Sequence, residues 1–469
     1  MSIAALDLDA IARARWFGSK GRSIDRIELD EAFVLDEHVP HLLALVSVVL
    51  DARGRDRQAY ALALTGSPLA SAAPGAGAWR ALALAMAEGR VIASLPATAD
   101  TGAPPTAALV CRPAAALADL APDGIGTERD LGADQSHTSV VLGETLLLKA
   151  YRRLQPGLNP DLEMTAFLSE EAAFPAVPRL AGYAEVVAQR GEPTTVAMLE
   201  EFIADGADAF ESIAAQLVDW VRAPGEVSPE FATEIAADLG TLTAGLHAAV
   251  AQGHGVPGMA PREATRDEVR AWAAAAHDHL GTALDVATGE AGAVVRDLAP
   301  RIEASLEVLD GLAVAPEVIR AHGDYHLGQV LIAPDGFRII DFEGEPLWPA
   351  EQRRAHRPAL RDVASMLRSL DHVARSAARR AEHLQGGPLQ HVGLDLDAWV
   401  RRGRERFLDA YRAGLLERRV FLDIDPDLLH AFEVDKELYE FAYAASYLPD
   451  WLYAPTEGMR ALFADGAPV

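Results

Sequence analysis

From residue 322 the sequence reads His322-Gly-Asp-Tyr-His-Leu-Gly-Gln329-Val-Leu-Ile332, and then, after Ala333, Pro334-Asp-Gly336 and Phe337-Arg-Ile-Ile-Asp341-Phe-Glu-Gly344. Two apolar runs, 330–332 and 337–340, flank the Pro-Asp-Gly turn, and this pattern predicts a β-hairpin. Polar residues cluster at the outer ends of both runs. The hairpin is therefore expected to bring Asp324 and Asp341 close together.

This pair of carboxylates suits a site that transfers a phosphoryl group. Such a site needs one carboxylate to orient or deprotonate the accepting hydroxyl, and we assign that role to Asp324. It needs another to hold the magnesium ion that bridges the nucleotide phosphates, which favours Asp341 with Gln329 as a second oxygen ligand. Glu343 is a further candidate ligand. The alternative, a turn that happens to contain an acid, does not account for Gln329 and Asp341 in register with it.

Composition excludes several classes of partner. The chain has 469 residues, enough for two or three subdomains, and a formal charge of −27 with a pI near 4.9. Such acidity argues against nucleic acid or an anionic membrane as a partner. A single cysteine, Cys111, permits no intramolecular disulfide framework and no cysteine-based zinc site. With no signal-like N-terminus and no run near the roughly 20 apolar residues of a membrane span, we expect a cytoplasmic protein.

The first part of the chain has a strand-like pattern. Apolar stretches at 32–35, 41–50 and 59–64, separated by turn residues, predict an antiparallel sheet. A Gly/Ala/Pro-rich segment and Pro104-Pro105 then break the pattern, so we place a boundary between about residues 90 and 120. The expected domains are an N-terminal cap subdomain at 1–95, an N-terminal lobe with phosphate-binding strands and hinge at 96–203, and a mostly helical C-terminal lobe at 204–469.

Lys149 is the predicted phosphate-binding residue. It closes the apolar strand Leu146-Leu-Leu-Lys149, where an ammonium group is costly unless it meets an anion such as a nucleotide phosphate. The preceding hairpin would cover the phosphates with hydroxyl residues, which are Ser136, Thr138 and Ser139.

A helix is expected to begin after Asn159, with Asn159 as N-cap and Pro160 in the first turn. Glu163, at the end of that turn, is placed to pair with Lys149 and fix its orientation. The alternative for Glu163 is an ordinary first-turn acid that interacts with the helix dipole.

The C-terminal segment 432–452 predicts another helix, which must end near Pro449. Tyr439 and Tyr443 share a face, with Lys436 and Glu440 beside them. Aromatic rings flanked by charged groups suit a sugar, whose hydroxyls need hydrogen-bond partners. A packing helix with a solvated charged edge is the alternative.

These motifs resemble those of the actinobacterial maltokinase branch of the eukaryotic-like kinases, of which aminoglycoside and choline kinases are more distant relatives. The resemblance rests on HGDYHLGQVL…IIDFEGEP, RWFGSKGR, QSHTSVV, NPDLE and the pattern DK..YE..Y, and it covers nearly the full length. The wider superfamily usually carries Asn in place of Gln329 and Asp-Phe-Gly where this chain reads Asp-Phe-Glu-Gly. Both departures are similar to those of the maltokinase branch.

The resemblance implies an α+β, bilobal protein-kinase-like fold with an extra N-terminal cap subdomain. It implies an ATP-dependent sugar kinase that uses Mg²⁺, with the adenine edge received by backbone groups of the hinge near Glu200 and Phe202. In the same way it implies acceptor contacts from the C-terminal lobe, for which the candidates are His326, Lys436, Tyr439, Glu440, Tyr443 and Trp451.

The expected acceptor is maltose, giving maltose 1-phosphate for α-glucan building. The alternative is glucosamine or another monosaccharide on the same scaffold, with Glu440, Glu437 or Asp450 to meet the ammonium of an amino sugar. A non-catalytic pseudokinase is a further alternative, although a binding module has no need of Lys149 and Asp324 together. The sequence leaves the oligomeric state open.

Overall fold

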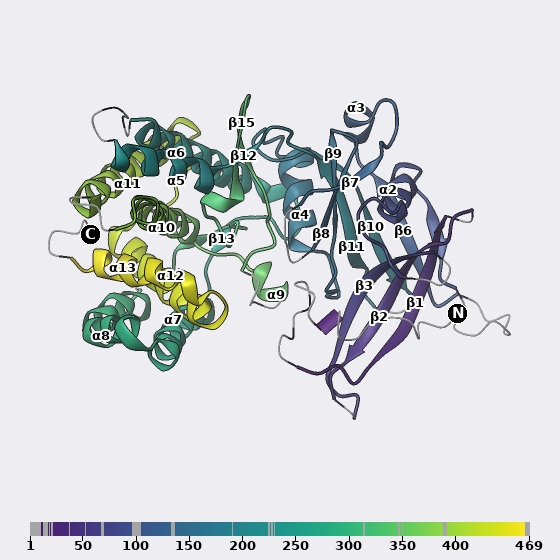
Figure 1. Ribbon diagram of the computed structural model, residues 1–469, viewed down its shortest axis with the longest axis horizontal. Helices are drawn as coiled ribbons and strands as arrows, with labels where there is room; N and C mark the ends of the chain where they lie inside the picture. The colour runs from purple at the N-terminus through teal and green to yellow at the C-terminus, as the bar shows by residue number, and fades with distance from the viewer. Residues whose placement is uncertain are drawn as a thin grey trace. The chain divides into compact units, whose positions relative to one another are not determined.

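The computed structural model divides into two compact units, Met1–Asp205 and Gly206–Val469 (Figure 1). The residues that it describes are 11–12, 17, 19, 22–36, 38–51, 53–66, 70–95, 105–132, 137–189, 191–223, 226, 228, 230–312, 315–345, 348, 350–387 and 392–464.

The first unit contains a four-stranded antiparallel sheet with the order β1-β2-β3-β4. This sheet confirms the strands predicted near the N-terminus. It is buried on both faces, because Leu43 packs with one hydrophobic cluster while its neighbours Leu42 and Ala44 pack with another. The strands are β1 (Arg26–Asp36), β2 (His41–Val49), β3 (Arg57–Thr65) and β4 (Ala70–Ser71).

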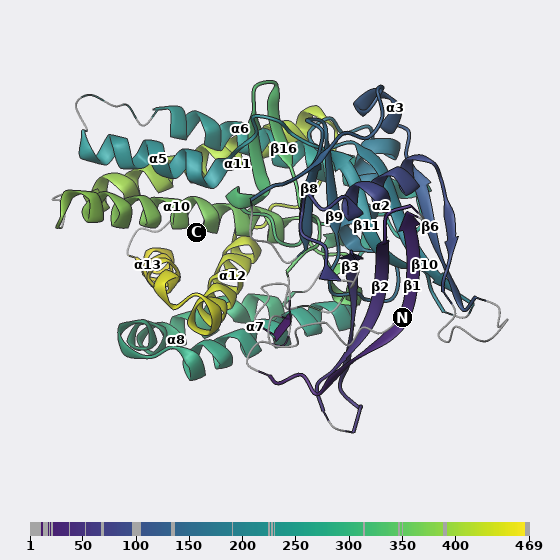
Figure 2. The same cartoon turned by 45° about the vertical axis from the view of Figure 1, so that its right-hand side comes forward.

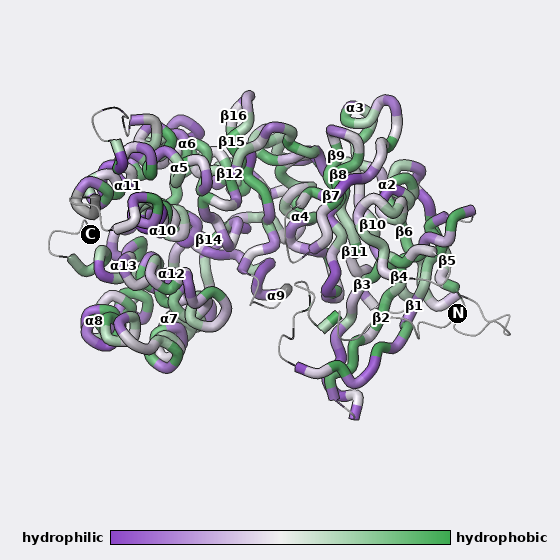
Figure 3. Tube along the Cα trace, viewed as in Figure 1, coloured by the Kyte–Doolittle hydropathy of each residue, from purple (hydrophilic) through white to green (hydrophobic). Residues whose placement is uncertain are grey.

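A seven-stranded antiparallel sheet with the order β5-β6-β10-β11-β9-β8-β7 completes the first unit. The first strand of this sheet lies before residue 96, which is the predicted first residue of the N-terminal lobe. Hydrophobic stretches follow the strands of both sheets (Figure 3). The strands are β5 (Val91–Ala93), β6 (Ala107–Pro113), β7 (Glu128–Asp130), β8 (Thr138–Leu142), β9 (Leu146–Ala150), β10 (Leu180–Ala188) and β11 (Thr194–Glu201), and the helices are α2 (Ala78–Ala87), α3 (Leu117–Leu120) and α4 (Pro160–Ala166).

Helices dominate the second unit, and α10 runs through its middle (Figure 2). Helix α10 packs against α5, α11, α12 and α13. Its buried stripe includes Val363, Met366 and Leu370. The helices are α5 (Ala209–Arg222), α6 (Glu230–Ala251), α7 (Arg266–Val286), α8 (Gly289–Asp310), α9 (Ala350–Arg353), α10 (Leu360–Gln385), α11 (Val392–Glu417), α12 (Pro426–Tyr447) and α13 (Tyr453–Leu462).

The second unit also carries two small sheets, one of which contains the predicted hairpin. Strands β15 (Val330–Ala333) and β16 (Gly336–Ile339) pair antiparallel, from Val330 opposite Ile339 to Ala333 opposite Gly336. Gly336 adopts a φ of 125°, which a side chain would disfavour, and so permits the tight turn. Strand β12 (Ala207–Asp208) adds to β15, and β13 (Arg262–Glu263) pairs with β14 (Glu317–Val318).

Two predicted helix boundaries are confirmed. The Asn159 side chain caps α4 by accepting a hydrogen bond from the Asp161 N–H, and α12 ends at Tyr447, before Pro449. Within the described ranges no helix is both long and apolar enough to span a membrane.

Candidate active site

A buried carboxylate on α10 holds the loop that carries Asp324. Asp362 accepts hydrogen bonds from the backbone N–H groups of His322 at 2.8 Å and Gly323 at 3.0 Å. Burial opposes ionisation of Asp362, but the hydrogen bond and charge of His247 outweigh burial and lower the pKa of this carboxyl. Asp362 therefore fixes the loop, and His247 is a buried core histidine.

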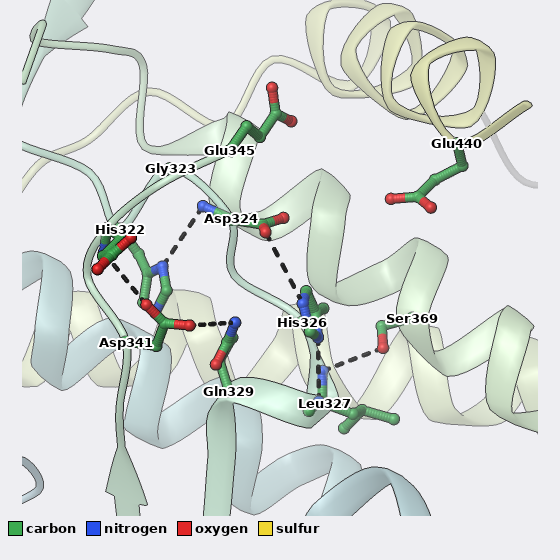
Figure 4. Close-up of polar contacts among 12 residues, drawn as sticks. His322, Gly323, Asp324, His326, Leu327, Gln329, Asp341, Glu345, Ser369 and Glu440 are labelled. Atoms are coloured by element: carbon green, nitrogen blue, oxygen red, sulfur yellow. Dashed lines mark hydrogen bonds and ion pairs between the residues drawn. The ribbon is translucent and has the colours of Figure 1, made fainter. Parts of the chain in front are cut away.

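Asp324 lies between two histidines in this loop (Figure 4). Its backbone N–H donates to Nδ1 of His322 at 3.4 Å, and its Oδ2 lies 3.9 Å from Nε2 of His326. Nδ1 of His326 accepts a hydrogen bond from the Gly328 N–H at 3.1 Å. Because Nδ1 is the acceptor, the neutral ring carries its proton on Nε2, the atom nearer to Asp324.

Lys436, from α12, is the cation of this site. Its Nζ lies 3.1 Å from Oδ1 of Asp324, 3.2 Å from Oε1 of Glu345 and 3.1 Å from Oε1 of Glu440. The lysine is 8% exposed. Burial alone would lower its pKa, but the three carboxylates raise it well above the usual value, so the lysine is charged. One ammonium thus faces three carboxylates, which leaves an excess of negative charge.

Asp324 and Glu345 respond differently to burial. For Asp324, burial favours the neutral form, but Lys436 and the neighbouring histidines outweigh it and lower the pKa. For Glu345, burial outweighs the attraction of Lys436 and raises the pKa. Asp324 is therefore the group that stays ionised. A residue that orients the acceptor hydroxyl and accepts its proton has to be ionised.

Gln329 and Asp341 lie side by side at the base of the hairpin (Figure 4). The Gln329 Nε2 donates to Oδ2 of Asp341 at 3.2 Å, and Asp341 has a φ of 64°, a strained value for a residue other than glycine. Their amide and carboxylate oxygens are ligands of the type that Mg²⁺ prefers. Across the described ranges no cluster of three or more His, Cys, Asp or Glu could hold a metal. The oxygens of Gln329 and Asp341 fit a magnesium ion, and their role as its ligands stays a prediction.

Glu343 is a weaker candidate for this ion. Its Oε2 lies 3.5 Å from NH1 of Arg353, and its backbone carbonyl accepts a hydrogen bond from the same NH1 at 2.8 Å. An arginine that already holds the carboxylate competes with a metal for it.

A cavity of about 310 Å³ lies next to Lys436 in the second unit. We call it the Trp451 cavity. Trp451 contacts Phe210 at a ring-centroid distance of 5.9 Å and His372 at 6.3 Å. The cavity is lined by Asp208, Phe210, Glu211, His326, Gly328, Ser365, Arg368, Ser369, His372, Lys436, Glu440 and Trp451.

Of the predicted acceptor residues, the structure brings His326, Lys436, Glu440 and Trp451 to this cavity. Tyr439 and Tyr443 line a different groove, although Lys436 Nζ lies 4.8 Å over the Tyr439 ring, and a role of the two tyrosines in acceptor binding stays a prediction. Neither Glu437 nor Asp450, the other candidates for an amino group, lines the cavity. The sequence reasoning missed Asp208, Phe210, Arg368, Ser369 and His372, which carry no motif of their own.

In the first unit, Lys149 is 5% exposed and lies between two buried carboxylates. Its Nζ is 3.1 Å from Oδ2 of Asp161 and 2.9 Å from Oε1 of Glu200. The sequence predicted Glu163 as its partner, whereas these contacts come from Asp161, two residues earlier on α4, and from Glu200 on β11. Asp161 is fully buried and Glu163 is half-buried, so α4 turns Asp161 toward the sheet.

The predicted hinge residues Glu200 and Phe202 lie at the end of β11 and just after it. Glu200 lies opposite Leu147 on β9 and Leu180 on β10, so its backbone belongs to the sheet while its side chain holds Lys149. The Phe202 N–H donates to the Thr145 carbonyl at 2.8 Å. A role of this segment in binding adenine stays a prediction.

The predicted phosphate-covering hydroxyls fall partly within the described ranges. The Thr138 hydroxyl accepts a hydrogen bond from Nε of Arg152 at 2.7 Å, and Ser139 lies opposite Lys149 in the β8–β9 register. Ser136 lies outside the described residues. A role of Thr138 and Ser139 in phosphate binding stays a prediction.

Comparisons with known proteins place this geometry in a family, although no family model matches the chain. The chain is 34% identical over 375 residues to a glucosamine kinase of Streptacidiphilus jiangxiensis, covering 79% of this chain and 80% of that protein. It is 32% identical over 343 residues to a glucosamine kinase of Mycolicibacterium smegmatis strain ATCC 700084 / mc(2)155, covering 72% and 80%. A solved glucosamine kinase in complex with glucosamine, ADP and inorganic phosphate matches with a TM-score of 0.72 and 27% identity over 98% of each chain.

These relatives confirm several predictions. The chain has the bilobal protein-kinase-like fold, is an ATP-dependent kinase that uses Mg²⁺, and acts on a small-molecule sugar. The resemblance to maltokinases in particular is not supported, because the relatives found by comparison are glucosamine kinases. The chain belongs to the glucosamine kinase family.

Proposed function

We propose that this enzyme transfers the γ-phosphoryl group of ATP to a hydroxyl of glucosamine. The observation that carries the proposal is the charge around Lys436. Asp324, Glu345 and Glu440 all lie within 3.2 Å of its ammonium, so one cation beside the Trp451 cavity faces three carboxylates. A cationic acceptor complements such a site, and neutral maltose does not.

Within the cavity, Glu440 is the carboxylate that we assign to the acceptor ammonium. It is one of the residues lining the cavity, whereas Asp324 and Glu345 are not. Trp451 offers an aromatic face for the apolar side of the pyranose ring, and His326 and Ser369 offer hydrogen-bond partners for hydroxyls. The names of the relatives likewise favour glucosamine, the alternative acceptor, over maltose.

In the proposed reaction, the acceptor hydroxyl lies against Asp324. Its oxygen forms the new bond to the γ-phosphorus as the bond from that phosphorus to the ADP oxygen breaks, and its proton passes to the Asp324 carboxylate. Because a carboxylate with a lowered pKa is a weak base, the proton moves late, as a loose transition state permits. Lys149 binds phosphate oxygens. Gln329 and Asp341 would hold Mg²⁺, which when bound would supply positive charge against the phosphates.

The test is the variant Glu440→Gln, measured with glucosamine and with glucose, which lacks the amino group. Loss of a charge-assisted hydrogen bond should raise KM for glucosamine by about tenfold or more and change KM for glucose by less than about threefold. The matched control is Glu417→Gln, an exposed acid on α11. Equal changes for both sugars, or no change for glucosamine, would contradict the assignment.

A further inference from the structure

A second cavity, of about 630 Å³, lies in the second unit and is about twice as large as the Trp451 cavity. We call it the tyrosine groove. Its size falls within the usual range of small-molecule sites. It is lined by Glu268, Ala271, Trp272, Ala275, Asp278, His279, Thr282, Trp348, Gln352, Ala355, His356, Arg357, Arg361, Tyr439, Ala442, Tyr443, Ser446 and Tyr447.

Three tyrosines form a row along one wall of the groove. Tyr439, Tyr443 and Tyr447 follow each other at four-residue intervals on α12, so the row is about 12 Å long at the helical rise. The first two rings are nearly parallel, with centroids 6.3 Å apart and planes 15° apart, and the next pair lies at 5.2 Å. Trp272, on α7, adds a further aromatic side chain to the lining. Tyr439 is 8% exposed and has the Lys436 ammonium 4.8 Å from its ring centroid, so Tyr443, Tyr447 and Trp272 are the rings that a ligand in the groove can cover.

The charges in the wall largely cancel. Arg361 and His279 both contact the Asp435 carboxylate, at 3.0 Å and 2.7 Å. Glu268 pairs with Arg262 at 2.6 Å. The wall also contains Asp278, which is exposed, and Arg357, which lies 3.9 Å over the Trp348 ring, so neither sign of charge is in clear excess. It suits a neutral ligand.

Neutral polar groups lie among the aromatic rings. Thr282, Gln352 and Ser446 line the groove, and the Thr282 hydroxyl donates to the Asp278 carbonyl at 2.8 Å, which leaves its oxygen able to accept. A flat aromatic ligand would cover these groups without bonding to them. A ligand with apolar faces and many hydroxyls would satisfy both the rings and the polar groups.

From this combination we propose that the tyrosine groove is a second carbohydrate site, which binds a neutral oligosaccharide of more than one pyranose ring. The rings of the sugar stack along the tyrosine row, and their hydroxyls bond to the polar groups between the aromatic side chains. The site is distinct from the Trp451 cavity and does not depend on which sugar is phosphorylated.

The proposal is tested by isothermal titration calorimetry on the full chain without ATP. The probes are maltotriose, cellotriose and triacetylchitotriose, each at millimolar concentration. At least one should bind with a single-site isotherm. Tyr443→Ala should weaken that binding by about tenfold or more. Tyr447→Ala should weaken it as well, and because Tyr447 is 55% exposed this variant decides the case if Tyr443→Ala fails to fold.

Two control variants locate the site. Phe421→Ala, at an aromatic residue that is 82% exposed and does not line the groove, should leave binding unchanged. Trp451→Ala, in the other cavity, should also leave it unchanged. No binding of any of the three probes would overturn the proposal. Binding that is lost in Trp451→Ala but kept in both tyrosine variants would overturn it too, because the sugar would then occupy the Trp451 cavity.

Discussion

The ammonium of Lys436 lies 3.1 Å from Oδ1 of Asp324, although 112 residues separate them in the sequence. Helix α12 thus supplies the cation that keeps the carboxylate ionised in a buried site. The same ammonium contacts Glu440, which lines the Trp451 cavity. Lys436 therefore joins the proposed base to the proposed acceptor site through two ion pairs.

Asp324→Asn should lower kcat by roughly 10²- to 10⁴-fold, because the amide cannot accept the proton of the acceptor hydroxyl. The dissociation constant for ATP, measured by calorimetry, should stay within about threefold of the wild-type value. Asp335→Asn, at the exposed tip of the hairpin, is the control. Loss of turnover together with loss of ATP binding would instead mean that Asp324 supports the fold.

Lys436→Met should raise the pKa of Asp324, because it leaves three neighbouring carboxylates without their common cation. The acid limb of the pH profile of kcat/KM should therefore move to higher pH, and kcat at neutral pH should fall. Lys436→Arg, which keeps the charge, should restore the acid limb to lower pH. An acid limb that does not move in Lys436→Met would show that this lysine does not control the base.

Asp161→Asn and Glu163→Gln together test which acid of α4 orients Lys149. The contact between Lys149 and Asp161 predicts that Asp161→Asn raises KM for ATP by about tenfold, since a buried charged pair loses one partner. Glu163→Gln should raise it by less than about threefold. Steady-state kinetics with varied ATP measure both. A larger rise in KM for ATP in Glu163→Gln than in Asp161→Asn would instead support Glu163 as the partner that orients Lys149, as the sequence predicted.

His372 makes stability depend on pH. Burial lowers the pKa of this histidine, but Glu437, at 3.0 Å, outweighs burial and raises it above 6.5. A raised folded-state pKa stabilises the protein fully below the unfolded value, and this contribution is lost as pH rises through the folded pKa. His372→Gln should therefore reduce the free energy of unfolding more near pH 5.5 than near pH 9, by about 1–3 kcal/mol at the lower pH.

Urea unfolding followed by tryptophan fluorescence at both pH values measures this difference. His254→Gln, at an exposed histidine, serves as the control and should show no such dependence. A destabilisation by His372→Gln that is equal at the two pH values would contradict the predicted linkage.

Local patterns made the hairpin and its polar ends predictable. Two apolar runs on either side of a Pro-Asp-Gly turn strongly favour a β-hairpin. The observed pairing of Val330 with Ile339 is the pairing expected for that hairpin. The contact between Gln329 and Asp341 is a consequence of that pairing. The helix start at Asn159 and the end of α12 before Pro449 were predictable for the same reason, since capping and proline act within a few residues.

Contacts between distant elements were not predictable. Asp161 and Glu163 both lie in the first turn of α4, and only the packing of that helix on the sheet decides that Asp161 meets Lys149. Helical spacing correctly put Tyr439 and Tyr443 on one face. It could not show that this face belongs to a groove shared with α7, while Lys436 and Glu440 line another cavity.

The central claim, phosphorylation of glucosamine, is tested most directly by ADP release from ATP and Mg²⁺ with glucosamine, glucose, maltose and an aminoglycoside as acceptors. We predict that kcat/KM for glucosamine exceeds that for maltose by about 100-fold or more, because only the amino sugar meets the carboxylate of Glu440 with a positive charge. A higher kcat/KM for maltose, or no ADP release above background with glucosamine, would contradict it.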